Sequence, residues 1–153
     1  MGGMRRRFMA LALFALVSLY TNAQYMMHEL QSHKWITTSG FKADGIFDLF
    51  LTFSDDKLYF LMKEKGTGKV VSDFYYDVYL VPRINEVSHF DSAKIGKEIF
   101  GKYIVMNRHK KGEAGNATKP SVTEILEFDD SHLVLYLERK SKISLQPYDG
   151  EKK

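Results

Sequence analysis

Four carboxylate side chains fall within segments that alternate polar and apolar residues, where an acid can face a buried interior. Asp48, Asp73 and Asp77 alternate in phase with residues that we expect to point outward, where acids keep the surface soluble. Glu124 instead alternates in phase with the apolar residues of segment 122–128. If that face points inward, desolvation raises the pKa of the Glu124 carboxyl. Glu124 is therefore the candidate acid of an interior site.

The five histidines show no spacing that suits a metal site or a catalytic pair. His28 and His33 are five positions apart, which puts them on different faces of a helix or a strand. The others fall in expected loops or turns: His89, His109 and His132. The chain has no cysteine, which excludes a disulfide scaffold, a thiolate metal site and a thiol nucleophile. We expect no metal and no cofactor.

No motif of a known catalytic centre is present. The sequence has no Gly-x-Ser-x-Gly elbow, and the segment 66–69 is too short to be a phosphate-binding loop. Paired acids occur at 55–56 and 129–130, but both pairs occupy turn positions rather than a cleft at the spacing that a glycosidase needs. No nucleophile, base and orienting group can be assembled from these residues, so we expect a protein that is not an enzyme.

Aromatic side chains give the strongest indication of function, since the chain has 11 Phe and 9 Tyr. Aromatic rings around a cavity, with a few polar tips, suit an apolar ligand. Together with Glu124, six aromatic residues on expected inner-face positions are candidate ligand contacts: Phe47, Phe53, Phe60, Phe74, Tyr76 and Tyr103. The alternative is that these rings fill the interior completely and leave no cavity.

The elements that must position these residues are strands, because apolar residues recur at every second position along most of the chain. Short turns rich in Gly, Ser and Asp separate several of the periodic segments. Helix is expected only within 24–32 and 91–98, and a polar loop over 108–120. The expected strands are 34–38, 45–53, 58–63, 70–81, 99–107, 122–128, 133–137 and 141–146.

Sequential antiparallel strands with one apolar face each must close or stack in order to hide their edges. The sequence therefore predicts an all-β fold, an antiparallel up-and-down β-barrel of about eight strands, with a β-sandwich as the alternative. The short hairpins between successive strands favour the barrel. Residues 24–153 form a single domain in this interpretation, since no linker or repeat divides them.

The first 23 residues have the pattern of a signal peptide. Arg5, Arg6 and Arg7 precede an apolar run that is too short to span a bilayer, and a small residue, Ala23, ends the segment. Removing these three arginines from the 22 Lys and Arg leaves 19, which equals the 19 Asp and Glu of the rest of the chain. We therefore expect an exported protein, periplasmic or extracellular, without stable membrane insertion, and no nucleic-acid partner for the basic cluster 108–111.

The layout resembles the lipocalin-like (calycin) barrels. The single tryptophan, Trp35, stands in the first expected strand behind Ser32-His33-Lys34, where lipocalins carry Gly-x-Trp. In that superfamily this tryptophan closes one end of the barrel and stacks under an arginine from a late strand, for which Arg139 is the candidate here. Such a cation–π contact contributes about 0.5–2 kcal/mol. The alternative is an ordinary core Trp35 and a solvated Arg139.

A more local resemblance covers roughly residues 75–105, which look like small exported proteins of Bacteroidota. The residues that carry it are Tyr75 to Leu80, Phe90 to Lys97 and Gly101 to Val105. In that phylum Asp-Ser followed by a small residue serves as an acceptor for O-glycosylation, so the resemblance implies Ser92 as a modified residue.

These observations support two hypotheses of function. The first is an exported, non-catalytic barrel that binds an apolar or amphiphilic small molecule. The second is a solid barrel that acts as a protein-interaction or inhibitor module through its loops, above all 81–97 and 108–120. A cavity and its lining would distinguish between them.

Overall fold

The computed structural model describes residues 23–109 and 120–150, apart from the side chains of Glu86, Arg108 and His109. Residues 1–22 of the expected signal peptide and most of the loop 108–120 lie outside this description. The strands are β1 (Tyr25–Met26), β2 (Trp35–Ser39), β3 (Phe47–Phe53), β4 (Lys57–Glu64), β5 (Val70–Val81), β6 (Phe100–Gly101), β7 (Tyr103–His109), β8 (Ser121–Phe128), β9 (Leu133–Leu137) and β10 (Ser141–Pro147).

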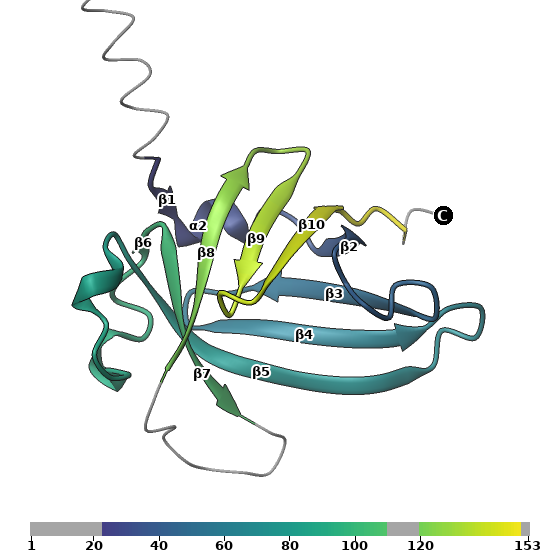
Figure 1. Ribbon diagram of the computed structural model, residues 1–153, viewed down its shortest axis with the longest axis horizontal. Coiled ribbons are helices and arrows are strands. Elements are labelled where there is room, and N and C mark those ends of the chain that lie inside the picture. The colour runs from purple at the N-terminus through teal and green to yellow at the C-terminus, as the bar shows by residue number, and fades with distance from the viewer. Residues whose placement is uncertain (1–22, 110–119, 151–153) are drawn as a thin grey trace, which may run out of the picture.

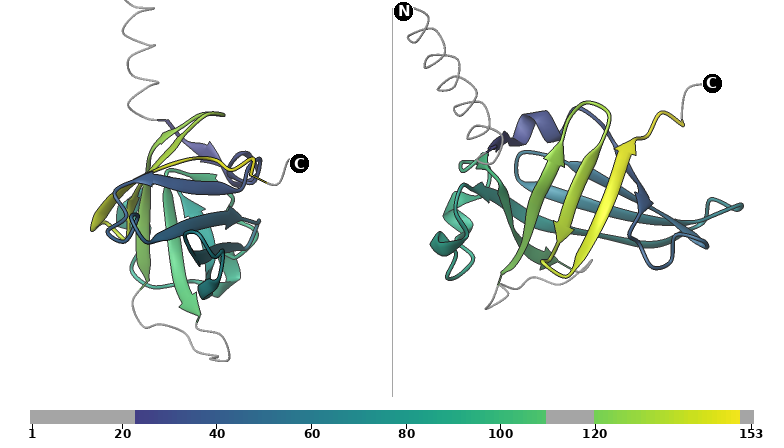
Figure 2. Two further views of the ribbon diagram at one scale, coloured as in Figure 1. Left: turned by 90° about the vertical axis from the view of Figure 1, so that its right-hand side faces the viewer. Right: turned by 45° about the horizontal axis from the view of Figure 1, so that its top comes forward.

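Eight of these strands close into one antiparallel barrel in the order β10-β2-β3-β4-β5-β7-β8-β9 (Figure 1). Each strand pairs with the next barrel strand along the chain, and the pairing of β10 with β2 completes the circle. The second view in Figure 2 shows β8, β9 and β10 side by side in the front wall. The prediction of an all-β, eight-stranded up-and-down barrel is confirmed, and the sandwich alternative is wrong.

Short polar turns set the pairing of neighbouring strands. Between β3 and β4, the backbone N–H of Lys57 donates to Ser54 Oγ at 3.0 Å, and Ser54 Oγ donates to Asp56 Oδ1 at 2.9 Å. Between β8 and β9, Asp129 Oδ1 accepts from the backbone N–H groups of Ser131 and His132 at 2.7 and 2.9 Å. Side-chain oxygens thus satisfy the turn donors, as the Ser and Asp content of these turns predicts.

The expected strand 99–107 is divided into two. Gly101 adopts a φ of 154° and lies so close to Val81 that an added Cβ would be 2.3 Å from the Val81 carbonyl carbon. Only glycine fits there without displacing β5. The chain therefore bends at this point, and the short β6 pairs with β1 outside the barrel while β7 enters it.

Among residues 23–109 and 120–150, helical structure is limited to α2 (Met27–Leu30) and two 3-10 turns, η1 (Ile84–Glu86) and η2 (Ser92–Lys94). The two regions in which the sequence predicts helix thus contain only a single turn each. Among the described residues, no helix is long and apolar enough to cross a membrane.

Apolar residues pack in two places, inside the barrel and on its outer wall. The interior cluster includes residues from all eight barrel strands and from α2. A second, smaller cluster lies outside, where Val87, Phe90 and Ile95 pack against Tyr79, Val81 and Val105. The wall formed by β5 and β7 is therefore covered on both faces.

Candidate functional site

The two ends of the barrel are built differently. At one end, here called the base, α2 lies across the opening, and Met27 and Leu30 are fully buried. Trp35 is also fully buried there, and its Nε1–H donates to the Leu30 carbonyl at 3.0 Å. Phe128 packs edge-on against the Trp35 ring, with centroids 5.9 Å apart. The base is thus filled by side chains and sealed.

The opposite end, here called the mouth, carries the connections 40–46, 65–69 and 138–140. The first view in Figure 2 looks at the molecule from the side of the β4–β5 turn. Several inner-face residues near this end are half-buried, whereas Met27, Leu30 and Trp35 at the base are fully buried. The half-buried residues are Phe41, Phe47, Met62, Phe74 and Leu137. The apolar lining therefore continues to the mouth, but side chains cover it less completely there.

Three aromatic rings from β4 and β5 contact one another inside the barrel. Phe60 and Phe74 are stacked, with centroids 5.0 Å apart and planes at 7°. Tyr76 meets Phe60 edge-on at 5.3 Å and Phe74 at 6.0 Å. Phe60 and Tyr76 are buried and Phe74 is half-buried, so the group leads from the core to a partly exposed ring.

A carboxylate meets this aromatic group from the other side of the lumen. The Tyr76 hydroxyl on β5 donates to Glu138 Oε1 at 3.2 Å, and the Ser121 hydroxyl on β8 donates to the same oxygen at 3.0 Å. The Glu138 backbone N–H donates to Thr123 Oγ1 at 3.0 Å. Glu138 follows β9, so these hydrogen bonds join three walls of the barrel at the mouth.

The turn that presents Glu138 is held in an unusual backbone conformation. Glu138 and Arg139 have φ values of 51° and 56°, and the Lys140 N–H donates to the Leu137 carbonyl at 3.0 Å. These angles match a type I′ hairpin turn, which normally carries Asn or Gly at both central positions. Two successive residues with a Cβ in this region store about 1 kcal/mol or more of strain each.

Glu138 also lines a groove on the outside of the barrel. The groove has a volume of about 510 Å³ and runs between the 84–88 segment, the start of β8 and the β9–β10 turn. Its apolar side chains come from Ile84, Val87, Pro120 and Val122, and its cations are Arg139 and Lys140. Glu138 and Ser121 therefore lie where the interior and an outer groove meet.

The wall is weakest next to the mouth, between β2 and β3. Only Trp35↔Leu51 and Ile36↔Phe50 are paired across this seam, whereas pairing between β3 and β4 runs from Phe47 to Phe53. Beyond Ile36 the two strands diverge, and Phe41 of the connecting loop packs against the core there. This seam and the half-buried rings lie on the same side of the molecule as the β4–β5 turn.

Two candidate ligand contacts point the wrong way for an interior site. Tyr103 packs on the outer wall with the second apolar cluster, and Ile104 beside it faces the interior. Glu124 also lies outside, where its Oε1 is 3.1 Å from Lys102 Nζ. The sequence misled because β7 is apolar on both faces and because a bulge between Ile125 and Glu127 shifts the alternation of β8.

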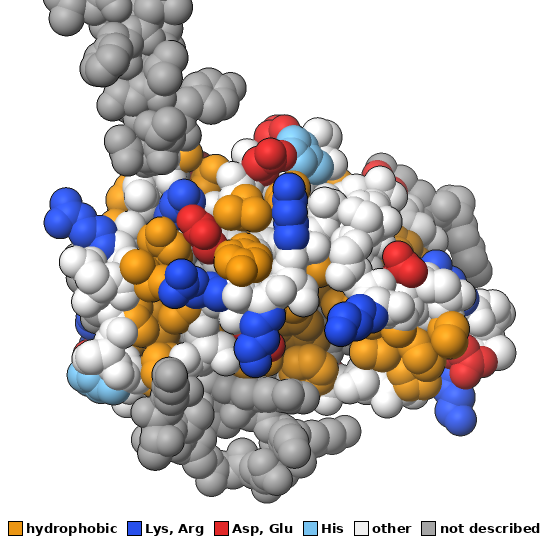
Figure 3. All heavy atoms as spheres, viewed as in Figure 1, with side chains coloured by type: hydrophobic (Ala, Val, Ile, Leu, Met, Phe, Trp, Pro, Cys, Tyr) orange, Lys and Arg blue, Asp and Glu red, His pale blue; other side chains and the backbone are white. Residues whose placement is uncertain are grey.

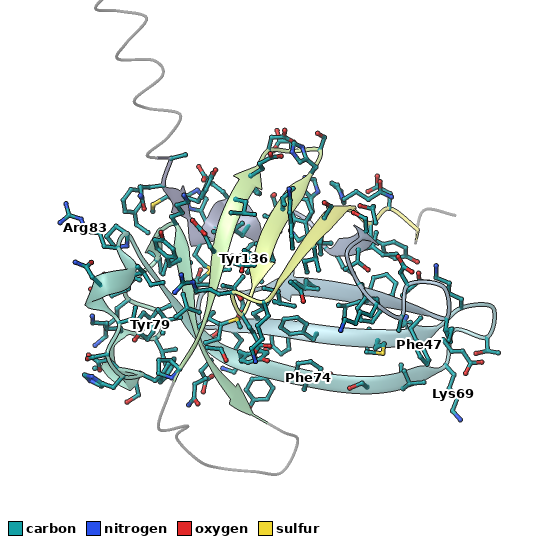
Figure 4. All side chains as sticks on the ribbon, in the orientation of Figure 1. Phe47, Lys69, Phe74, Tyr79, Arg83 and Tyr136 are labelled. Atoms are coloured by element: carbon teal, nitrogen blue, oxygen red, sulfur yellow. The ribbon has the colours of Figure 1, made fainter. Side chains whose placement is uncertain are left out.

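The other candidate aromatics face the interior. Phe53 and Phe60 are buried in the core with Tyr76, and Phe74 packs against the same cluster. Phe47 lies on the same side of β3 by alternation, toward the β4–β5 turn (Figure 4). Sequence reasoning missed Glu138, Ser121 and Thr123, because nothing in their spacing indicates that a turn brings them beside Tyr76.

The expected contact between Trp35 and Arg139 does not form. β10 separates them, since it starts opposite Leu137 beside the Arg139 turn and ends opposite Trp35. The seven residues of β10 span roughly 20 Å from first to last, so the two side chains lie at opposite ends of the barrel. Trp35 is a core residue at the base, and Arg139 is exposed at the mouth.

Other reactive side chains are dispersed. Within residues 23–109 and 120–150, no three His, Cys, Asp or Glu side chains come together as a metal site. Ser92 is exposed at the start of η2, next to Asp91, whose Oδ1 accepts from the Ala93 N–H at 3.0 Å. The basic cluster 108–111 has no described side chain.

The mouth combines a group of contacting aromatic rings, Phe60, Phe74 and Tyr76, with the acid Glu138. Comparison of this chain with known protein families, with curated proteins and with solved structures found no match.

Proposed function

We propose that this chain is exported and acts as a non-catalytic, lipocalin-like barrel that binds an apolar or amphiphilic small molecule at its mouth. The observation that carries the proposal is the incomplete burial of several apolar inner-face residues near the mouth. Trp35, Leu51 and Leu58 toward the base are fully buried, whereas Phe74 and Met62 toward the mouth are half-buried. Apolar surface left accessible inside a rim of strands is the usual setting of a small-molecule site.

The Glu138 carboxylate beside this apolar surface favours an amphiphilic ligand over a purely apolar one. Tyr76 and Ser121 hold the Glu138 carboxylate at the edge of the aromatic group. A ligand with an apolar body would cover Phe74, while its polar end would meet oxygen atoms that the protein has already oriented. Sites of this kind combine a large apolar lining with few fixed polar atoms.

The binding activity is tested first on protein prepared without detergent. Native mass spectrometry should show a co-purifying hydrophobic molecule, or an apolar fluorescent probe should bind the empty protein saturably with one site. An empty protein on which the probe finds no saturable site would refute the proposal and leave the protein-interaction module as the function to pursue.

A pair of aromatic variants then locates the site. Phe74→Gln changes a half-buried ring on the inner face of β5, and Tyr59→Gln changes an exposed ring on the outer face of the neighbouring strand. We expect probe affinity to fall about tenfold or more in the first variant and to stay unchanged in the second, since only Phe74 would lose buried area with the ligand. Equal losses in both variants would place the probe outside the lumen.

A further inference from the structure

We propose that Glu138 is the head-group contact of the mouth and selects ligands whose polar end donates hydrogen bonds, a primary amine above all, over ligands that end in a carboxylate. This inference rests on the proposed binding function and names the class of ligand. It is carried by the position, the partners and the open oxygen of the Glu138 carboxylate.

The two carboxylate oxygens of Glu138 differ in their hydrogen bonds to the described residues. Oε1 accepts both hydroxyl donors, Tyr76 at 3.2 Å and Ser121 at 3.0 Å. Oε2 has no hydrogen-bond partner among the described residues, and it is not among their fully buried unpaired atoms. The carboxylate is thus oriented through one oxygen and offers the other to solvent or to a ligand.

In the described part of the chain, the hydrogen-bond partners of the Glu138 carboxylate carry no charge. Its two known side-chain partners are neutral hydroxyls, and no described Lys or Arg lies within ion-pair distance of it. Arg139 and Lys140 follow it in the chain but are exposed at the tip of the turn. A half-buried carboxylate held by neutral donors attracts a cationic donor and repels a second carboxylate.

The backbone conformation of Glu138 also supports a role for its carboxylate. Glu138 occupies a left-handed position with a φ of 51°, although glycine or asparagine would hold the turn with less strain. The conformation directs the Glu138 side chain toward Tyr76 and Ser121 rather than along the hairpin. Strain of this kind is often retained where it places a functional group.

The apolar end of such a ligand would rest on the ring group. Tyr76 contacts Glu138 with its hydroxyl and Phe60 and Phe74 with its ring, so the acceptor and the aromatic surface are continuous. A linear amine with its nitrogen at Glu138 Oε2 could therefore lay its chain along the half-buried Phe74. The arrangement matches the two ends of an amphiphile.

The experiment compares three ligands that share one chain and differ only at the head: dodecylamine, dodecanol and dodecanoate, each below its micelle concentration. Displacement of an apolar fluorescent probe gives the three affinities. We expect the amine to bind about tenfold or more tightly than dodecanoate, with dodecanol between them, because a charge-assisted hydrogen bond is replaced by repulsion between like charges.

Three substitutions then test the role of Glu138. Glu138→Gln keeps the size and the acceptor oxygen but removes the charge, and should bring the amine and dodecanoate to within about threefold of each other while dodecanol changes little. Asp73→Asn removes one negative charge from the exposed outer side of β5 and should leave the order of the three ligands unchanged. Ser121→Ala, which removes one orienting hydroxyl, should weaken the amine preference in the same direction as Glu138→Gln but less.

The outcomes separate the two proposals. If dodecanoate binds the unchanged protein as tightly as dodecylamine, or if Glu138→Gln preserves the preference for the amine, the inference about Glu138 is wrong while the binding function stands. If Asp73→Asn abolishes the preference for the amine as fully as Glu138→Gln does, the preference comes from the net charge of the protein and not from a contact with Glu138. Saturable binding by none of the three ligands, with the probe also unbound, refutes the proposed function itself.

Discussion

The base and the mouth of the barrel differ in how completely side chains cover the apolar interior. At the base, α2, Trp35 and Phe128 fill the end, and the one polar atom of the Trp35 ring is satisfied by the Leu30 carbonyl. At the mouth, aromatic rings are left half-buried beside a carboxylate on a strained turn. The base follows the rules that maximise stability, and the mouth departs from them. Such departures are where a function is expected.

The surface reflects the same difference. In the described part of the chain, the exposed large apolar residues include Ile46, Val70 and Val71, which all lie where β3 and β5 start near the β4–β5 turn. Apolar side chains are also visible at that end in Figure 3. Apolar surface is thus left both inside and outside the mouth.

The largest expected effect is a difference in stability between the variants Trp35→Ala and Phe74→Ala. Trp35 is fully buried, so its truncation should lower the free energy of unfolding by about 3–5 kcal/mol. Phe74 is half-buried, and its truncation should cost only about 1–2 kcal/mol. Urea denaturation followed by far-UV circular dichroism measures both, since Trp35 is the only tryptophan and cannot serve as a common fluorescence probe. Equal costs at the two sites would remove the distinction between base and mouth.

The second prediction concerns the hydrogen bond that crosses the mouth. Tyr76→Phe keeps the ring in the aromatic group but removes the hydroxyl that donates to Glu138. We expect a loss of about 1–2 kcal/mol, because the carboxylate loses one of its two donors. Double-mutant cycles with Glu138→Gln should show coupling between these positions, while a cycle of Tyr76→Phe with Asp73→Asn should be additive. Absence of coupling with Glu138 would contradict the geometry.

A third substitution should raise stability. Arg139→Gly places glycine at an exposed turn position with a φ of 56°. Relief of the strain exceeds the extra chain entropy of glycine, so we expect a gain of about 0.5–1 kcal/mol. A decrease in the free energy of unfolding by the same amount would show that the turn is not strained, and would contradict the difference drawn between mouth and base. Thermal denaturation of the two proteins side by side decides this.

The smallest effect lies at the base, in the β8–β9 turn. The His132 ring is 3.0 Å from Glu127 and 2.9 Å from Asp129. The hydrogen bond to Glu127 raises the pKa of His132 above 6.5, and hydrogen bonds from Ser131 lower the pKa of Asp129 to about 2. The His132 contribution to stability is complete below pH 6.5 and is lost as pH rises through the folded pKa. The Asp129 contribution is complete above pH 3.8 and is lost as pH falls toward about 2.

The pH dependence of stability should therefore flatten on its alkaline side in His132→Gln. NMR titration of the His132 ring in folded and in urea-unfolded protein checks the cause directly, with the higher pKa expected in the folded state. A folded pKa at or below the unfolded one would show that the two carboxylates do not hold the ring in solution. The expected effect is small because this turn is exposed to solvent.

Much of the architecture follows from the sequence. The period-two pattern locates all eight barrel strands to within a few residues, and the Ser and Asp turns identify the hairpins. Phe53, Phe60 and Tyr76 are also placed correctly in the interior. The orientation of Tyr103 is not predictable in the same way, since the connection between β5 and β7 folds back over the outer wall and packs with Tyr103 there.

What the sequence determined by itself is local: strands with one apolar face, short turns, and no cysteine for another kind of scaffold. Only the tertiary structure decided which face of β7 and β8 points inward, that Arg139 lies far from Trp35, and that Glu138 meets Tyr76. The reason is physical. Alternation is a property of neighbouring residues, whereas a bulge, the tilt of closing strands and a covering loop depend on partners distant in the chain.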